Sequence, residues 1–417
     1  MKYGLIGYPL KHSFSKEIHK KLSNNHYELN ELNPDNFDSF MKHKNFLGIN
    51  VTIPYKEKVI PYLDFIDPRA KAINAVNTIV NENGKLYGFN TDYYGLLAII
   101  KKNNIEIENK NILILGTGGT SKTATQVCLD LKGKVFKAST KPNFDYQYDN
   151  LDKAYDEINV IINTTPNGMY PHSFDDELVD LSCFKHLEAV IDVIFNPLQT
   201  KLIIKAKELG LKTATGLYML VTQAVYANSK FFNETINEQE INERIDKIYN
   251  EIKQSKQSIV LIGMPSCGKS SLARLLSSKL NREYFDSDKE IEKIIGMKIA
   301  CFLNKDNEQE FREIENKVIK ELSLKTNAII ATGGGVILNK ENIDNLKQNG
   351  KIYFINRSLK YLKPTKSRPL SSDIAALKEK YDFRLPLYIK YSDKIIDGDN
   401  EFDQKIIEIV DDFTNNN

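Results

Sequence analysis

One run of residues has the types and spacing of a phosphate-binding loop. It reads Gly-Met-Pro-Ser-Cys-Gly-Lys-Ser from Gly263, a complete GxxxxGK[ST] pattern between an apolar segment and a helical run. Glycines let backbone N–H groups curl around phosphate oxygens at a helix N-terminus, Lys269 neutralises charge on the β- and γ-phosphates, and the Ser270 hydroxyl can hold Mg²⁺. The pattern predicts ATP chemistry, with phosphate contacts from Gly263, Ser266, Cys267, Gly268, Lys269, Ser270 and Ser271.

Candidates for the other parts of a phosphoryl-transfer site follow this loop along the chain. Asp286 and Asp288 come after an apolar segment, where they could act on a substrate or, equally, cap the next helix. Only eight of the 57 basic residues are arginines, and a planar guanidinium suits a carboxylate or phosphate better than an ammonium does. The candidates in this part of the chain are Arg312, Gly333, Gly334, Gly335, Arg368 and Arg384.

An earlier glycine turn has the character of a dinucleotide site. The apolar segment 111–115 runs into Gly-Thr-Gly-Gly-Thr-Ser, so Ser121 occupies the position of the last fingerprint glycine. About twenty residues further on, an NAD site has an acidic residue that binds the ribose hydroxyls. Here Ser139, Thr140 and Lys141 follow a strand at that place. This combination suits a 2′-phosphate, so we predict NADP(H), bound by Gly116, Gly118, Gly119, Thr120, Ser121, Ser139, Thr140 and Lys141.

Short apolar segments alternate with helical patterns through most of the chain. This alternation predicts an α/β protein with parallel sheets, whose loops at the carboxyl ends of the strands carry the two glycine turns. The expected strands are 3–6, 47–51, 111–115, 133–138, 159–163, 189–193, 258–262, 328–331 and 351–355.

Residues 258–410 resemble shikimate kinase, because the phosphate loop and the motifs after it occur in that family's order. The resemblance implies a P-loop domain of the nucleoside monophosphate kinase type. It implies that Asp288 orients or deprotonates the attacking hydroxyl and that Asp286 lies near the metal. It implies that Arg312 and Arg384 clamp the substrate carboxylate. It also implies that Gly333, Gly334 and Gly335 approach the substrate ring closely and that Arg368, on the lid, stabilises the transferring phosphate.

Polar residues in the first 253 positions are too dense to be strand ends alone. The segments are 7–15, 50–56, 75–78, 90–92, 163–169, 192–200 and 216–224, and together they resemble shikimate dehydrogenase. Reducing a ketone by hydride needs a proton donor at the oxygen, and Lys56 can supply one if Asp92 holds and tunes its ammonium group. The resemblance implies this pair, substrate contacts from Ser13, Ser15, Thr52, Asn77 and Gln223, and Gly216 beside the nicotinamide.

Ordinary structural roles stay open for these residues taken singly. Ser13 and Ser15 could cap the helix that follows them, Asn77 could be a turn residue, and Lys56 could be a solvated cation. All of them being accidental at once is improbable.

The two resemblances predict the division of the chain. Residues 1–100, completed by 215–254, would form the substrate-binding lobe of the dehydrogenase, and 101–214 its Rossmann-like NADP lobe. A polar helix with isoleucines at helical spacing leads into a hinge at 255–257, and residues 258–417 would form the kinase domain.

Composition and charge exclude several other classes of protein. The 417 residues carry 57 basic and 55 acidic side chains, a net charge of +2, so no basic excess points to nucleic acid or to a membrane surface. No apolar run has the ~18 to 20 residues of a membrane span, and no signal peptide is expected at the start. The four cysteines are widely spaced and predict free thiols in a reducing, cytoplasmic compartment.

We therefore expect a bifunctional enzyme that reduces 3-dehydroshikimate to shikimate with NADPH and then phosphorylates shikimate with ATP and Mg²⁺. Three alternatives remain at this point. One half could be inactive, the first half could act on quinate with NAD, or the chain could be a shikimate-responsive regulator built from former enzyme domains. The retained lysines and aspartates argue against the last, and oligomeric state is not predicted.

Overall fold

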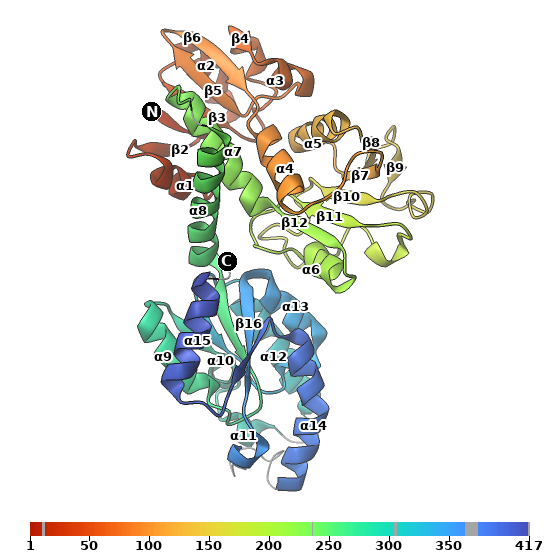
Figure 1. Ribbon diagram of the computed structural model, residues 1–417, viewed down its shortest axis with the longest axis vertical. Helices are drawn as coiled ribbons and strands as arrows, with labels where there is room; N and C mark the ends of the chain where they lie inside the picture. The colour runs from red at the N-terminus through yellow and green to blue at the C-terminus, as the bar shows by residue number, and fades with distance from the viewer. Residues whose placement is uncertain (11–12, 236, 304–306, 363–373, 416–417) are drawn as a thin grey trace. The chain divides into compact units, whose positions relative to one another are not determined.

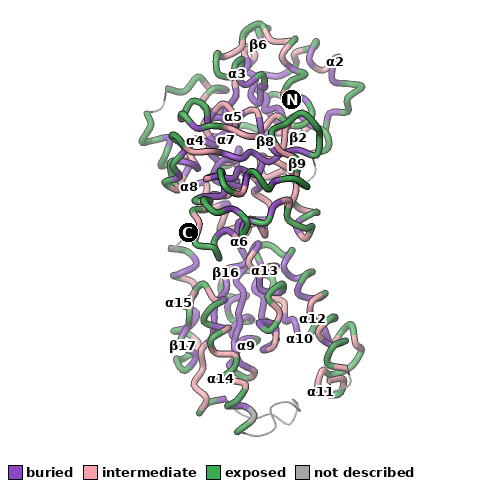
Figure 2. The backbone as a smooth tube through the Cα atoms, turned by 90° about the vertical axis from the view of Figure 1, so that its right-hand side faces the viewer, coloured by how far each residue is buried: buried purple, intermediate pink, exposed green. Residues whose placement is uncertain are grey.

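The computed structural model describes residues 1–10, 13–235, 237–303, 307–362 and 374–415. Its internal contacts divide the chain into two compact units. The first unit comprises Met1–Asn196 and Leu202–Ile252, and the second comprises Pro197–Lys201 and Lys253–Asn417. Unit 1 contains two six-stranded sheets and unit 2 contains one five-stranded sheet, each with its own buried strands (Figures 1 and 2).

The first sheet of unit 1 is mixed, which differs from the parallel sheets that we predicted. Its strand order is β2-β1-β3-β5-β6-β4, and β5 runs antiparallel to both β3 and β6. β5 and β6 form a hairpin over Asn83-Gly84, both at positive φ, which an Asn-Gly pair favours. The elements of this lobe are β1 Tyr3–Gly7, α1 Ser15–Leu22, β2 Tyr27–Glu31, α2 Pro34–His43, β3 Gly48–Val51, β4 Phe65–Ile66, α3 Pro68–Ile73, β5 Thr78–Glu82 and β6 Lys85–Phe89.

The second sheet of unit 1 is parallel throughout, as predicted, in the order β12-β11-β10-β7-β8-β9. Its inner strands β10 and β11 are buried along their whole length, because a parallel sheet is covered by helices on both faces. The elements are β7 Asn111–Leu115, α5 Gly119–Asp130, β8 Lys134–Ser139, β9 Tyr146–Gln147, β10 Val160–Asn163, β11 Ala189–Asp192, α6 Lys201–Glu208 and β12 Lys212–Thr215.

Three further helices, α4, α7 and α8, complete unit 1 and lead into the second unit along the chain. α4 (Asp92–Lys102) packs against α7 (Gly216–Phe231), and together they join the two sheets of the unit (Figure 1). α8 (Glu238–Lys256) buries the expected isoleucine stripe at Ile241, Ile245, Ile248 and Ile252. It continues to Lys256, so the first two residues of the predicted hinge are helical and only Gln257 lies between α8 and the next strand.

Unit 2 is a five-stranded parallel sheet in the order β14-β15-β13-β16-β17, with α9 and α15 on one side and α12 and α13 on the other (Figure 1). The middle strand, β13, is buried along its whole length, and its neighbour β16, labelled in Figure 2, is buried at most positions. The elements are β13 Ser258–Ile262, α9 Lys269–Leu280, β14 Tyr284–Asp286, α10 Ser287–Ile295, α11 Ile299–Phe302, α12 Glu308–Ser323, β15 Ile329–Ala331, α13 Lys340–Asn349, β16 Gly350–Asn356, α14 Ile374–Tyr391, β17 Lys394–Asp397 and α15 Phe402–Asn415.

Candidate active sites

Lys56 and Asp92 form a largely buried ion pair in unit 1. The Lys56 Nζ lies 2.6 Å from Asp92 Oδ2, and the two side chains are 15% and 12% exposed. Asp92 is the first residue of α4, where the helix dipole favours a carboxylate, and Lys56 lies in the loop after β3. Lys56 is therefore held by a carboxylate, as a proton donor would be, and is not a solvated surface cation.

A buried network fixes the orientation of the Asn77 side chain beside this pair. The Asn77 Oδ1 accepts the backbone N–H of Thr91 at 2.7 Å and the hydroxyl of Thr78 at 3.1 Å. A backbone N–H can only donate, so the amide oxygen faces Thr91 and the Nδ2 is left as a donor; one of its hydrogens goes to the Thr91 hydroxyl at 3.1 Å. Asn77 can thus offer an N–H to an acceptor oxygen.

The other predicted substrate residues come from separate segments of the same lobe. The Ser15 N–H donates to Ser13 Oγ at 3.2 Å, but the N-cap of α1 is Phe14, so neither serine is the N-cap that the capping alternative describes. Gln223 is buried on α7 and donates to the Leu220 carbonyl at 2.8 Å. Thr52 follows β3, and a side chain at Gly7 would begin 2.4 Å from its methyl group.

The first glycine loop joins β7 to α5 as expected. Gly116 has φ +102°, and a side chain there would begin 3.0 Å from the Thr164 hydroxyl. Gly118 is the N-cap of α5, so the loop ends at the N-terminus of a helix, where backbone N–H groups favour anions. The serine at the last fingerprint position, Ser121, is fully buried. Thr120 lies beside it on the first turn of α5.

The residues predicted for the 2′-phosphate lie at the end of β8. Ser139 is buried, and its hydroxyl accepts the Lys141 backbone N–H at 3.1 Å. The side chains of Thr140 and Lys141 are exposed. Of the three residues, Thr140 and Lys141 therefore have the side chains that an exposed phosphate could reach.

Gly216 begins α7 at a point where no side chain fits. A Cβ there would lie 2.0 Å from the carbonyl oxygen of Val193. The Gly216 N–H donates to the Ile194 carbonyl at 3.0 Å, so this backbone crosses directly over the segment after β11. That crossing requires glycine.

The second glycine loop has the curled backbone of a phosphate cradle. Gly263, Ser266 and Gly268 all have positive φ, at 147°, 65° and 97°. The Lys269 Nζ is buried and donates to the carbonyls of Gly263 and Met264, each at 2.9 Å. Lys269 thus holds the loop together from inside, and α9 starts at this residue. Cys267 is buried within the loop, whereas Ser266 and Ser270 are exposed.

Three consecutive glycines after β15 are each closely approached by a different neighbour. A side chain at Gly333 would begin 2.5 Å from Asp288 Oδ1, one at Gly334 would begin 2.7 Å from Pro265, and one at Gly335 would begin 2.5 Å from Arg312 Nη1. Pro265 belongs to the phosphate loop. The glycine turn therefore brings that loop, the aspartate and the arginine to one place.

The predicted carboxylate clamp is assembled around the same turn. Arg312 Nη1 lies 2.7 Å from Glu315 Oε2, and Arg384 Nη1 donates to the Gly334 carbonyl at 3.0 Å. Glu315 is almost completely buried, and this burial raises its pKa although Arg312 acts in the opposite direction. Both guanidinium groups are thus oriented by protein groups before any ligand binds.

Asp286 has the capping role that the sequence left open. It is the N-cap of α10, and its Oδ1 accepts the Asp288 N–H at 3.1 Å. Asp288 is partly exposed and faces Gly333, so the two aspartates differ in environment. The predicted lid residue Arg368 lies outside the described residues.

Comparison with known proteins adds to this geometry. Residues 5–79 match the family model for the shikimate dehydrogenase substrate binding domain. A shikimate dehydrogenase (NADP(+)) from Clostridium perfringens strain SM101 is 39% identical over 245 residues, which cover 54% of this chain and 90% of that relative. This chain belongs to the shikimate dehydrogenase family. Residues 265–414 match the family model for shikimate kinase, so the chain joins a dehydrogenase to a kinase.

Solved structures agree with the dehydrogenase assignment. Shikimate dehydrogenase 1 from Peptoclostridium difficile is 36% identical, has a TM-score of 0.54, and the match covers 60% of this chain and 98% of that one. Shikimate 5-dehydrogenase from Thermus thermophilus, solved with NADP(H) and shikimate, is 26% identical, has a TM-score of 0.52, and the match covers 60% and 99%. The predicted fold class and both enzyme assignments are confirmed.

The sequence did not point to several residues that lie at one or the other of the two sites. The Ser287 hydroxyl accepts the Gly333 N–H at 2.8 Å, and a side chain at Gly268 would begin 3.4 Å from the Phe402 ring. Ser287 lies between the two predicted aspartates, and Phe402 carried no local signal. In the dehydrogenase, Glu57 and Lys122 form an ion pair at 2.7 Å that no spacing rule predicts.

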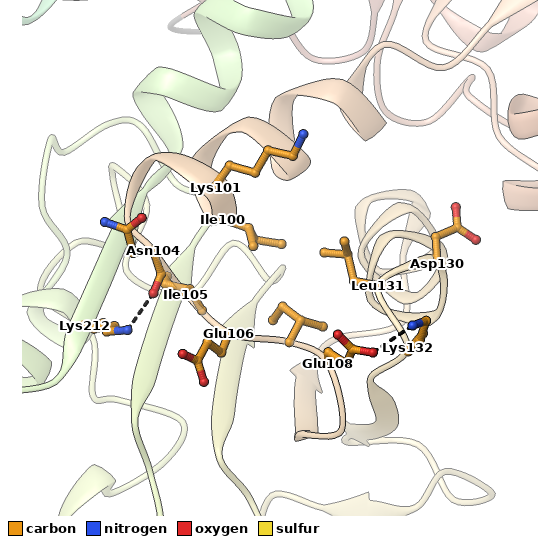
Figure 3. Close-up of a pocket in the computed structure, with 11 residues that line it drawn as sticks. Ile100, Lys101, Asn104, Ile105, Glu106, Glu108, Asp130, Leu131, Lys132 and Lys212 are labelled. Carbon is orange, nitrogen blue, oxygen red and sulfur yellow. Dashed lines mark hydrogen bonds and ion pairs between the residues drawn. The ribbon is translucent and has the colours of Figure 1, made fainter.

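A separate pocket of about 590 Å³ lies where the end of α4, the segment after it and the last turn of α5 meet (Figure 3). Its wall includes the Lys132–Glu108 ion pair and the hydrogen bond from Lys212 to the Asn104 carbonyl. None of the residues that line it was predicted as a site residue.

All four cysteines are free thiols, as predicted, and burial raises the pKa of Cys128 to about 12. In the described part of the chain, no helix combines the length and apolar character needed to cross a membrane.

Proposed function

We propose that the dehydrogenase part reduces 3-dehydroshikimate to shikimate with NADPH, and that the kinase domain transfers the γ-phosphate of ATP to the 3-hydroxyl of shikimate. The main support for the first reaction is the ion pair of Lys56 with Asp92, in which Nζ and Oδ2 are 2.6 Å apart. Gly119 of the dinucleotide loop lies against the same lysine, so the proton donor is close to the expected cofactor site. The main support for the second reaction is the turn at Gly333, Gly334 and Gly335, which lies against the phosphate loop, Asp288 and Arg312.

In the reduction, the nicotinamide supplies a hydride when NADPH is bound. Lys56 would donate the proton to the carbonyl oxygen, while Asp92 keeps its ammonium group in place. Asn77 would donate an N–H to a substrate oxygen, and Ser13, Ser15, Thr52 and Gln223 would bind the carboxylate and the hydroxyls. Gly116, Gly118, Gly119, Thr120, Ser121, Ser139, Thr140, Lys141 and Gly216 would hold the cofactor.

In the phosphoryl transfer, Asp288 would align the attacking hydroxyl. Lys269 and Arg368 would neutralise charge on the transferring group, and Arg312 with Arg384 would bind the substrate carboxylate. Ser270 and Asp286 offer a hydroxyl and a carboxylate, the hard oxygen ligands that suit Mg²⁺ alongside phosphate oxygens and water. When bound, the ion neutralises charge on the β- and γ-phosphates.

Two assays on the whole chain test the proposed reactions separately. NADPH oxidation is followed by absorbance with 3-dehydroshikimate as substrate, and ADP release is followed with shikimate as substrate. We expect both reactions, each saturating with its own substrate. Oxidation of NADPH only with a different ketone, or no ADP release with shikimate, would contradict the corresponding half of the proposal.

The preference for NADPH is expected to depend on Lys141. Lys141→Ala should raise the KM for NADPH by about tenfold to a hundredfold and leave the KM for NADH unchanged, since a charge-assisted hydrogen bond to phosphate is worth about 1.5 to 3 kcal/mol. Steady-state kinetics with both cofactors measures this difference. Lys153→Ala, an exposed lysine of the same lobe, is the control. Equal loss with both cofactors would rule out a phosphate contact.

Gly333→Ala is expected to slow shikimate-dependent ATP use at least about tenfold. The new methyl group would begin 2.5 Å from Asp288 Oδ1 and displace that carboxylate, and misplacing a reacting group by about 1 Å can cost about a hundredfold. ADP release measures the effect, and NADPH oxidation by the same sample shows that the chain is folded. If this variant released ADP at the wild-type rate, Asp288 would not act on the substrate at the kinase site.

A further inference from the structure

Helix α5 of the nucleotide lobe is held against the substrate lobe by residues next to the catalytic pair. Glu57 directly follows Lys56, and its carboxylate lies 2.7 Å from the Nζ of Lys122 on α5. The two side chains are 48% and 31% exposed, so water screens the pair only partly. This ion pair links the loop of Lys56 to the first turns of α5.

The other end of α5 is held beside Asp92. Tyr93 directly follows Asp92, and its hydroxyl donates to Asp130 Oδ2 at 2.8 Å. Burial and the hydrogen bond to Asp130 raise the pKa of Tyr93 to about 12, so the hydroxyl keeps its proton at neutral pH. Between the two ends, Asn90 donates to the Thr123 hydroxyl at 3.4 Å. Each catalytic residue therefore has a neighbour in sequence that contacts α5.

These contacts matter because α5 carries the glycine loop at its N-terminus. The helix has 12 residues, so Lys122 and Asp130 lie about 12 Å apart along its axis. Two contacts that far apart fix the direction of the helix as well as its position. The start of α5 already lies close to Lys56, since a side chain at Gly119 would begin 3.5 Å from Lys56 Cδ.

We propose that Glu57 with Lys122, and Tyr93 with Asp130, are positioning pairs for the reduction. They hold the glycine loop in register with Lys56 and Asp92, so that the hydride and the proton reach the same carbonyl group. The inference rests on the proposed dehydrogenase function. Hydride transfer requires reacting atoms about 3 to 3.5 Å apart, so a small rotation of α5 slows the step without removing any catalytic group.

Charge reversal tests the first pair in the full chain. Lys122→Glu and Glu57→Lys are each expected to lower kcat for NADPH oxidation about tenfold, and the double variant to return within about threefold of wild type. With NADPH deuterated at the transferred position, the single variants should show a larger isotope effect, because hydride transfer limits their rate. A purely structural role would lower the amount of active enzyme and leave the isotope effect unchanged.

Two controls separate this effect from folding and from general charge. ATP use with shikimate is measured on the same samples and should be unchanged in every variant. Lys132→Glu breaks the exposed Lys132–Glu108 pair, 2.8 Å long, just after α5, and should leave NADPH oxidation at the wild-type rate. Tyr93→Phe tests the second pair and should slow oxidation about threefold or more, again with a larger isotope effect.

The outcomes that overturn the proposal are distinct from failure of the proposed function. If the double charge reversal is as slow as the single variants, Lys122 acts on the cofactor directly and Glu57 does not position it. If the single variants or Tyr93→Phe keep the wild-type rate and isotope effect, that pair does not position α5. If the wild-type chain oxidises no NADPH with 3-dehydroshikimate, the dehydrogenase proposal itself fails.

Discussion

Lys56→Ala is expected to slow NADPH oxidation with 3-dehydroshikimate by about 10²- to 10⁴-fold, the range that a general acid contributes. The variant removes the proton donor and leaves Asp92, 12% exposed, without the ammonium group that lies 2.6 Å from it. Substrate reduction therefore fails at the oxygen even when the hydride donor is bound. Stopped-flow absorbance of NADPH with saturating substrate measures the loss.

A neighbouring lysine provides the control for this prediction. Lys58 is exposed two positions away, so Lys58→Ala should keep the wild-type rate. ATP use with added shikimate should be the same in Lys56→Ala as in the unmodified chain. A Lys56→Ala protein that still oxidised NADPH at a normal rate would show that another group protonates the substrate.

Lys269→Ala is expected to have the reverse effect. It should slow phosphoryl transfer by at least about 10²- to 10³-fold, because the lysine would stabilise transition-state charge on the phosphates. It also donates to the carbonyls of Gly263 and Met264, so its removal loosens the loop that cradles the phosphates. ADP release with saturating shikimate measures the loss, and NADPH oxidation should be unaffected.

A second lysine of the same helix serves as the matched control. Lys279 is exposed in the last turn of α9, and Lys279→Ala should not change ADP release. Normal ADP release by Lys269→Ala would mean that this loop does not bind ATP in the proposed way. The two lysine variants together separate the reactions within one chain.

Local patterns predicted the parts of this protein that depend on local backbone geometry. The phosphate loop from Gly263, the turn at Gly116 and the strands that lead into both are where the sequence placed them, because such turns require particular residue types at fixed spacing. The same reasoning missed the β5–β6 hairpin, although its Asn83-Gly84 turn was a readable signal.

Contacts between distant segments could not be predicted in this way. The ion pair of Glu57 with Lys122 joins residues 65 positions apart, and exposed lysines and glutamates are too common for their types to indicate a partner. Gly334 illustrates the reverse case. The sequence marked this glycine as a candidate, but a tertiary contact explains why it is a glycine: a side chain there would begin 2.7 Å from Pro265 of the phosphate loop.

The central claim is that one chain converts 3-dehydroshikimate to a phosphorylated shikimate. The direct measurement supplies the full chain with 3-dehydroshikimate, NADPH and ATP-Mg²⁺, and determines the products by mass spectrometry and NMR. We predict shikimate 3-phosphate, with one NADPH oxidised and one ADP released for each molecule formed. Accumulation of shikimate without ADP, or unchanged 3-dehydroshikimate, would contradict the claim.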